Sequence, residues 1–314
     1  MAPQNKQLLY TLFKWLLLVA SYAFLAYKLI TFKQYPELAS EWAKAWSTQL
    51  FSLVLVLALL PFNWLLETYK WKFLVRKLET LSLRNAFKSV MIGNTTAFFT
   101  PNRLGEFPGR TIGLQKGNKL QGMAIGVLGS LSQTLTIMLF GIPAAWMLFI
   151  YNKSSFYQTI DYYVLALIFT SLLCAYFFLP QLCRVLKNKQ LFRRIENLMH
   201  SLSQFSYVDL TGILLLSIVR YVIFCTQFYF LLHFFGIHIE PLFGAIGIAA
   251  NYLFITFAPS MAFSEGAVRA SVAILTIGVF TPNTVGIALT GLFIWLINFV
   301  LPMFIGSLFL GRKK

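Results

Sequence analysis

The chain has 314 residues, of which 58% are hydrophobic, 17% aromatic and only 11% charged. Its 26 Lys and Arg residues outnumber 10 Asp and Glu residues, giving a formal net charge of +16. Soluble domains are about 25% charged, so an ordinary soluble domain, a disordered chain and a disulfide scaffold are excluded. Nucleic-acid binding needs basic residues on a water-exposed face, and this composition argues against it. The class is integral membrane protein.

Motifs for metal, nucleotide or redox chemistry are missing from the sequence. Three cysteines are dispersed without a C-x-x-C pair, and the histidine pair His233 and His238 lacks carboxylates at ligand spacing. Only two aspartates are present, which argues against the aspartate-rich Mg²⁺ sites of membrane prenyl transferases. No phosphate-binding G-x-x-x-x-G-K-[ST] loop occurs. We therefore expect no metal, no cofactor and no ATP hydrolysis by the chain itself.

Six apolar runs are long enough to cross a bilayer, which takes roughly 20 residues. They are about 8–30, 47–68, 121–150, 160–183, 209–235 and 283–311. Eighteen of the 26 basic residues, Lys70 among them, fall in the two ends and in alternate connections, with only four acids, including Glu67. Basic loops stay in the cytoplasm. We expect one integral membrane domain over residues 1–314, in a bacterial cytoplasmic (inner) membrane, with both termini inside.

Two further apolar regions, about 86–115 and 241–280, are broken in the middle by Pro, Gly and charged residues. The basic residues flanking the first region belong to one face, so the chain has to enter and return there, and the second region does the same from the opposite face. We expect an all-α polytopic membrane protein with six full spans and two opposed re-entrant helical hairpins, about eight membrane segments. Full crossings with a different parity are the alternative. Irregular backbone at membrane depth is tolerated only where protein buries it or it lines a cavity.

The first broken region contains a compact motif at residues 99–110. Pro101 lacks an N–H group and disfavours helix at the preceding residue, so the descending helix is expected to end there. Glu106 and Arg110 are four residues apart. If a short helix resumes after the turn, their side chains share one face and can pair.

The second broken region, at residues 257–269, repeats this pattern. Pro259 is followed by a small-residue turn, and Glu265 and Arg269 are again four apart. Two such motifs indicate a degenerate internal repeat. The repeat halves are roughly 47–150 and 209–311.

Six charged residues fall inside apolar regions: Arg103, Glu106, Arg110, Arg220, Glu265 and Arg269. Each would cost about 2.5–3.5 kcal/mol at the bilayer centre, so they are expected to face a protein interior or a wet cavity. Arginine forks match phosphate oxygens, and we expect a headgroup site there, with Asn94 on its descending arm. Arg220 lies near enough to the cytoplasmic side to snorkel instead. The other interpretation is that the Glu–Arg pairs only shape the hairpins.

Around the first motif the sequence resembles the transmembrane domain of lysylphosphatidylglycerol synthases, a family of flippase-like membrane proteins. The resemblance rests on Trp-Lys-Phe-Leu at 71–74, Gly-Asn at 93–94, and Thr-Pro-Asn-Arg-Leu-Gly-Glu at 100–106. The family pattern there is close to T-P-G-R-L-G-E followed by an Arg. Asn102 stands where Gly is usual, and Arg110 fits the later Arg. In the second motif the family has Arg just before Glu, an order that this chain reverses.

This resemblance implies a module that moves lipids between leaflets. The sequence ends at residue 314 without a soluble aminoacyl-transfer domain, so we expect a stand-alone member and not an enzyme that lysylates lipids. The expected ligand is an anionic phospholipid or a polyisoprenyl phosphate. One alternative is an intramembrane lipid-linked transferase with Glu106 or Glu265 as base. Another is a non-transporting partner of a lipid-modifying enzyme. A homo-oligomer or a complex with a lipid-synthesis enzyme is also left open.

Overall fold

The structure is a computed structural model that describes residues 27, 30, 49–152, 162–187, 195–259 and 262–310. Within these ranges all regular elements are helical. Five helices are long and apolar enough to cross a membrane. They are α3 (Leu50–Val75), α6 (Lys119–Tyr151), α7 (Tyr162–Leu186), α9 (Tyr207–Phe234) and the continuous segment Thr284–Leu310. The prediction of an all-helical membrane protein is confirmed, while the expected first span, 8–30, lies almost wholly outside the described residues.

The segment Thr284–Leu310 changes its helical type in the middle. It consists of α12 (Thr284–Trp295), one π-helical turn (Leu296–Val300) and α13 (Leu301–Leu310). A π-helical turn inserts an extra residue and is frequently found at functional sites. This turn carries Asn298 and Phe299, whose contacts are described below.

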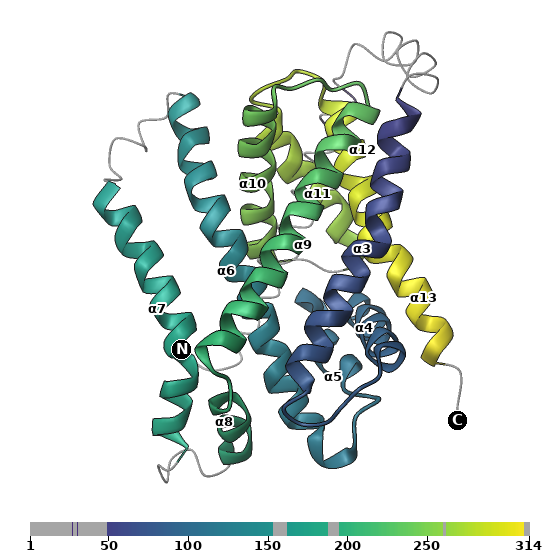
Figure 1. Cartoon of the computed structure of the whole chain (residues 1–314). Coiled ribbons are helices and arrows are strands. Elements are labelled where there is room, and N and C mark those ends of the chain that lie inside the picture. The colour runs from purple at the N-terminus through teal and green to yellow at the C-terminus, as the bar shows by residue number, and fades with distance from the viewer. Residues whose placement is uncertain are drawn as a thin grey trace, which may run out of the picture.

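The remaining helices are shorter. They are α4 (Leu83–Phe98), α5 (Glu106–Arg110), α8 (Glu196–Ser203), α10 (Pro241–Phe257) and α11 (Ala262–Ile277), together with 3₁₀ turns at Pro101–Arg103 and Lys116–Asn118. In Figure 1, α4 and α5 lie in the half of the molecule that holds α8 and the C-terminal end of α3. The pair α10 and α11 lies in the other half, beside α12 (Figure 1). The two interrupted regions therefore occupy opposite ends of the bundle.

Helix α3 continues well beyond the apolar run that predicted it. The run was expected to end near residue 68, but the helix reaches Val75. Glu67 and Lys70 are consequently 4% and 2% exposed. Their assignment to a cytoplasmic connection was wrong, because this part of α3 packs against α4 and α9 and buries its polar face inside the protein.

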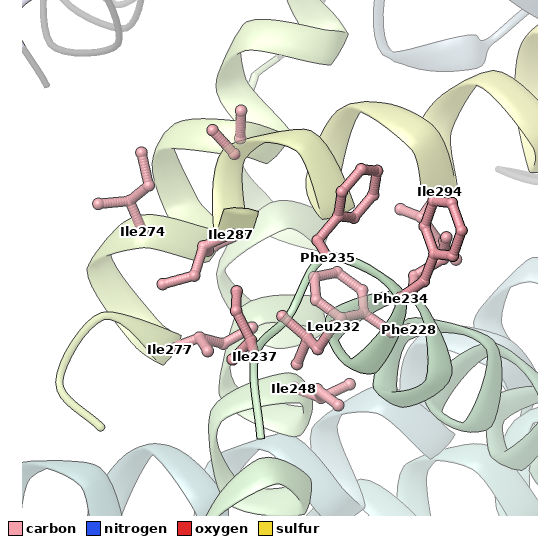
Figure 2. Close-up of a cluster of buried hydrophobic side chains, with 14 of the residues drawn as sticks. Phe228, Leu232, Phe234, Phe235, Ile237, Ile248, Ile274, Ile277, Ile287 and Ile294 are labelled. Atoms are coloured by element: carbon pink, nitrogen blue, oxygen red, sulfur yellow. The ribbon is translucent and has the colours of Figure 1, made fainter. Parts of the chain in front are cut away.

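The core of the C-terminal half is built mainly by four helices, with Val56 of α3 also packed into it. Figure 2 shows Phe228, Leu232 and Phe234 from α9 beside isoleucines of the other three helices. These are Ile248 from α10, Ile274 and Ile277 from α11, and Ile287 and Ile294 from α12. This cluster fixes α10 and α11 against α9 and α12, and so holds the second interrupted region in place.

Helix α4 is held by close contact with the C-terminal helix. The hydroxyl of Thr95 donates to the carbonyl of Met303 at 2.8 Å. A Cβ on Gly306 would overlap the carbonyl oxygen of Met91. Backbones approach this closely only where the side chain is absent or small. The first interrupted region is thus tied to the helix that carries the π-helical turn.

Candidate functional site

The turn between α4 and α5 has an unusual backbone. Helix α4 ends at Phe98, and Thr100 is extended with φ −119° and ψ 144°, as the proline predicted. Asn102 and Arg103 then adopt positive φ values of 49° and 60°. Asparagine tolerates this left-handed conformation, whereas arginine rarely adopts it. Residues held in such conformations cluster at active sites and ligand clamps.

Small residues close the hairpin formed by α4 and α5. The hydroxyl of Thr96 donates to the Gly105 carbonyl at 2.6 Å, and the Gly105 amide donates to the hydroxyl of Thr100 at 2.7 Å. A Cβ on Gly109 would overlap Oγ1 of Thr96, and a Cβ on Gly93 would lie 2.5 Å from Cγ of Arg110. The close approach sets α5 against α4 and fixes its charged face.

Glu67 is the centre of an ion network on the α3 side. Its Oε1 lies 2.7 Å from Nη1 of Arg110. Its Oε2 lies 2.7 Å from Nη1 of Arg220 and 3.0 Å from Nζ of Lys70. Arg110 also pairs with Glu106 within α5, as the four-residue spacing predicted. One carboxylate therefore serves three cations, from α3, α5 and α9.

Arg103 connects this network to the second hairpin. In α11, Arg269 Nη2 contacts Glu265 Oε1 at 2.8 Å, which confirms the second predicted pairing. Nη1 of Arg103 lies 3.9 Å from the same Glu265 oxygen, and its Nε lies 3.8 Å from Glu106. Its remaining nitrogen donates to Asn94 Oδ1 at 3.4 Å. The two motifs, far apart in the sequence, meet in one network.

The network has a net charge of +2. It contains five cations and three carboxylates: Lys70, Arg103, Arg110, Arg220 and Arg269 with Glu67, Glu106 and Glu265. These residues are far apart in the sequence, but the packing of the helices brings all eight together. The sequence predicted six of them as an intramembrane group with the same net charge, since Glu67 and Lys70 cancel.

Phe299 in the π-helical turn lies against two of the arginines. The guanidinium carbon of Arg103 is 4.3 Å from the ring centroid and that of Arg269 is 4.2 Å away. Cations within about 6 Å of an aromatic face are attracted by its quadrupole. The ring therefore supports one arginine from each hairpin.

Amide side chains extend the network beyond the arginines. Nδ2 of Asn63 donates to Oδ1 of Asn298 at 2.8 Å, and Nε of Arg220 donates to Oδ1 of Asn63 at 2.9 Å. Asn298 donates in turn to Oε1 of Gln227 at 3.2 Å. Paired amides of this kind hold side chains in one geometry. These amides therefore fix the orientation of the Arg220 side chain.

A cavity of about 730 Å³ opens onto these groups. Its polar wall includes all but one of the predicted site residues: Asn94, Arg103, Glu106, Arg220, Glu265 and Arg269. Glu67, Lys70, Asn63 and Asn298 also line it. Arg110 does not line the cavity. It is buried behind Glu67 and Glu106, so the expectation that it contacts the headgroup is not met by its position.

The rest of the cavity wall is mainly apolar and aromatic, with a few uncharged polar residues such as Ser130, Gln133 and Thr134. It includes Trp64, Phe107, Ile137, Tyr221, Phe224, Tyr252, Ile255 and Phe257. Among the described residues, His, Cys, Asp and Glu side chains form no group of three or more that could hold a metal ion. The site therefore combines a basic wall with an apolar one, a lining suited to an amphiphile with an anionic end.

Comparison with known families gives a match over nearly the whole chain. The model described as the lysylphosphatidylglycerol synthase TM region matches residues 15–306. The chain belongs to the lysylphosphatidylglycerol synthase transmembrane family. The family is membrane-associated and lipid-related, and the matched region contains both hairpins and all eight charged residues of the network. Searches of curated proteins and of solved structures found no match.

Four site residues of this family member escaped prediction from the sequence: Asn63, Glu67, Lys70 and Asn298. The first three follow each other at spacings of four and three in α3, which places them on one face of a helix. A polar stripe of this kind in an apolar helix is a signal for a buried site. It was missed because the charges were counted toward the loop after the span. Asn298 gave no comparable signal.

Proposed function

We propose that this protein moves an anionic lipid between the two leaflets of the membrane, with the headgroup passing through the basic cavity. The observation that carries the proposal is the net +2 network, seven of whose eight charged residues line a cavity between two interrupted hairpins while Arg110 lies behind them. Charges at membrane depth cost about 2.5–3.5 kcal/mol each. If these residues served only as internal ion pairs, the numbers of positive and negative charges would be equal. An excess of two cations favours the binding of an anion.

Arg103 is the cation best placed to receive a headgroup. Its side chain is 25% exposed, and its polar contacts are 3.4–3.9 Å long. Charge-assisted hydrogen bonds are usually about 2.7–2.9 Å, so Arg103 is only loosely engaged. Arg220 and Arg269 would assist from the other walls. Arg110 would act as a positioning residue, because it holds Glu67 and Glu106 without reaching the cavity.

The apolar wall supports a lipid ligand. Aromatic and aliphatic side chains, among them Phe224, Ile255 and Phe257, share the cavity with the arginines. A soluble anion would leave this wall in contact with water, whereas acyl or isoprenyl chains would cover it. Glu106 and Glu265 would act as counter-ions when the site is empty.

The interrupted regions would serve as gates from opposite faces. Helices α4, α10 and α11 have 16, 17 and 16 residues, fewer than the roughly 20 needed to cross a bilayer. The pair α4 and α5 and the pair α10 and α11 lie at opposite ends of the bundle (Figure 1). Transporters place substrate sites between such broken elements, often in inverted repeats. Both termini would then lie in the cytoplasm of a bacterial cell, with the protein in its inner membrane.

The proposal is tested by transport in vesicles of phosphatidylcholine that contain the purified full-length protein. Acyl-labelled phosphatidylglycerol and phosphatidic acid report leaflet exchange through loss of fluorescence to an external quencher. Arg103→Ala is expected to lower the protein-dependent rate at least about tenfold, and Arg103→Lys to restore little of it, because lysine lacks the planar fork. Arg84→Ala, at an exposed position of α4, is the matched control. If both lipids exchanged no faster with the protein than in protein-free vesicles, the proposed function would be contradicted. If Arg103→Ala exchanged lipid as fast as the wild type, the proposed site would be contradicted.

A further inference from the structure

We infer that the headgroup taken by this cavity is a phosphate monoester. The inference rests on the proposed lipid translocation and adds the chemical class of the ligand. A phosphate monoester carries about −1.5 to −2 charges at pH 7, which matches the net +2 of the network. A phosphodiester carries one charge and would leave one cation uncompensated. A zwitterionic headgroup has no net charge and would leave both excess cations uncompensated.

Two carboxylate oxygens in the cavity wall already show how the site holds an anionic oxygen. Oε1 of Glu265 contacts both Arg269, at 2.8 Å, and Arg103, at 3.9 Å. Oε2 of Glu67 contacts Arg220 at 2.7 Å and Lys70 at 3.0 Å. Each of these oxygens stands in for a phosphoryl oxygen bound by two cations. The cations are thus arranged so that one anionic oxygen bridges a pair.

A phosphate monoester has the number of oxygens that this arrangement favours. It presents three terminal oxygens, all strong acceptors, whereas a diester presents two. The two cation pairs come from different elements that line one cavity, so a third oxygen would contact Arg103 while the other two face Arg220 and Arg269. A diester would leave one of these guanidinium groups with its carboxylate neighbour alone, so it would use fewer of the cations than a monoester does.

Arg103 would determine whether the site prefers a doubly charged headgroup over a singly charged one. It is the only member of the network within the described residues whose ion-pair distances all exceed 3.5 Å. Its neutralisation would therefore reduce the net charge to +1 while disturbing the other pairs least. The variant Arg103→Gln should then bind a singly charged headgroup about as well as a doubly charged one.

The test measures lipid binding by the full-length protein in phosphatidylcholine nanodiscs, with titration followed by native mass spectrometry. The probes are phosphatidic acid, phosphatidylglycerol, cardiolipin and soluble glycerol 3-phosphate. Wild-type protein is expected to prefer phosphatidic acid over phosphatidylglycerol by at least about tenfold. Arg103→Gln is expected to reduce that preference to less than about threefold, and Arg84→Gln to preserve it.

Other results separate the monoester inference from the lipid proposal. Equal binding of phosphatidic acid and phosphatidylglycerol, with transport intact, would overturn the monoester inference alone. Cardiolipin binding as tightly as phosphatidic acid would also overturn it, because the site would then select two charges from diesters. Glycerol 3-phosphate displacing the lipid at comparable concentration would support the monoester class and overturn a lipid as its source. Binding of no anionic lipid would overturn both.

Discussion

Glu67 on α3 and Arg220 on α9 form an ion pair with 2.7 Å between carboxylate oxygen and guanidinium nitrogen. The pair joins two long helices at the depth of the cavity. The same carboxylate also neutralises Lys70 and Arg110. Glu67 is therefore the anchor of the α3 side of the network, and its loss would leave the buried Lys70 and Arg110 and the partly exposed Arg220 without their shared counter-ion.

Glu67→Gln is expected to destabilise the protein by about 3–5 kcal/mol, the usual cost of removing one partner from a buried ion pair. Adding Lys70→Met restores the net charge of +2 and is expected to recover part of the loss. The measurement is denaturant unfolding in detergent micelles. Glu196→Gln, at an exposed position of α8, should change the free energy of unfolding by less than about 0.5 kcal/mol. A Glu67→Gln variant as stable as the wild type would refute the anchoring role.

Phe299→Leu is expected to weaken binding of phosphatidic acid several-fold while leaving the fold intact. Leucine keeps the apolar bulk in the π-helical turn but removes the ring that supports Arg103 and Arg269. Each cation–π contact is worth about 0.5–2 kcal/mol depending on desolvation. Phe299→Tyr retains a π face and should bind near the wild-type level, as measured by the nanodisc titration. Weak binding by both variants would indicate a packing role only.

Gly109→Ala is expected to disrupt the first hairpin. The added methyl group would overlap Oγ1 of Thr96 and lie 2.9 Å from Cα of Gly93. Overpacking of this kind costs about 1–3 kcal/mol and would shift α5 with its charged face. Lower thermal stability and slower lipid exchange are both expected.

The matched control for this variant is Gly117→Ala. A Cβ at Gly117 meets no atom within 4 Å, so stability and exchange should stay at the wild-type level. If Gly109→Ala behaved like this control, the close α4–α5 packing would not be needed for the site.

Cysteine labelling tests the two re-entrant hairpins. In a variant without its native cysteines, Arg84→Cys and Gly117→Cys flank the first region and should react with an impermeant maleimide from one side of sealed vesicles. Glu240→Cys and Pro282→Cys flank the second region and should react only from the other side. All four positions are exposed. Labelling of Arg84→Cys and Gly117→Cys from opposite sides would show that the first region crosses the membrane.

Local chemistry made much of the site predictable. Pro101 marks the end of α4 because its ring and missing N–H group act on adjacent residues. The pairs Glu106–Arg110 and Glu265–Arg269 follow from helical spacing alone. The all-helical membrane class follows from composition and apolar run length. The internal repeat stays a prediction.

Contacts between distant helices could not be read in the same way. Nothing in the spacing of Arg103 indicates that it meets Glu265, or that Phe299 lies between two arginines. Glu67 was misplaced for a different reason. A hydropathy window ends a span at its first charges, but a charge that faces protein does not end the helix. The outcome depends on packing partners, which the window does not include.

The carboxylates that hold the arginines would also set how easily the proposed headgroup leaves. Glu265 and Glu106 already occupy part of the contact capacity of Arg103 and Arg269. The proposed headgroup would therefore bind by exchanging one anion for another, and its affinity would reflect the difference between them. On its departure the carboxylates would recapture the guanidinium groups, so release would leave no bare charge behind. A transport pathway requires binding weak enough to leave as well as strong enough to enter, and under the proposed function these internal carboxylates would keep a headgroup from binding too tightly to be released.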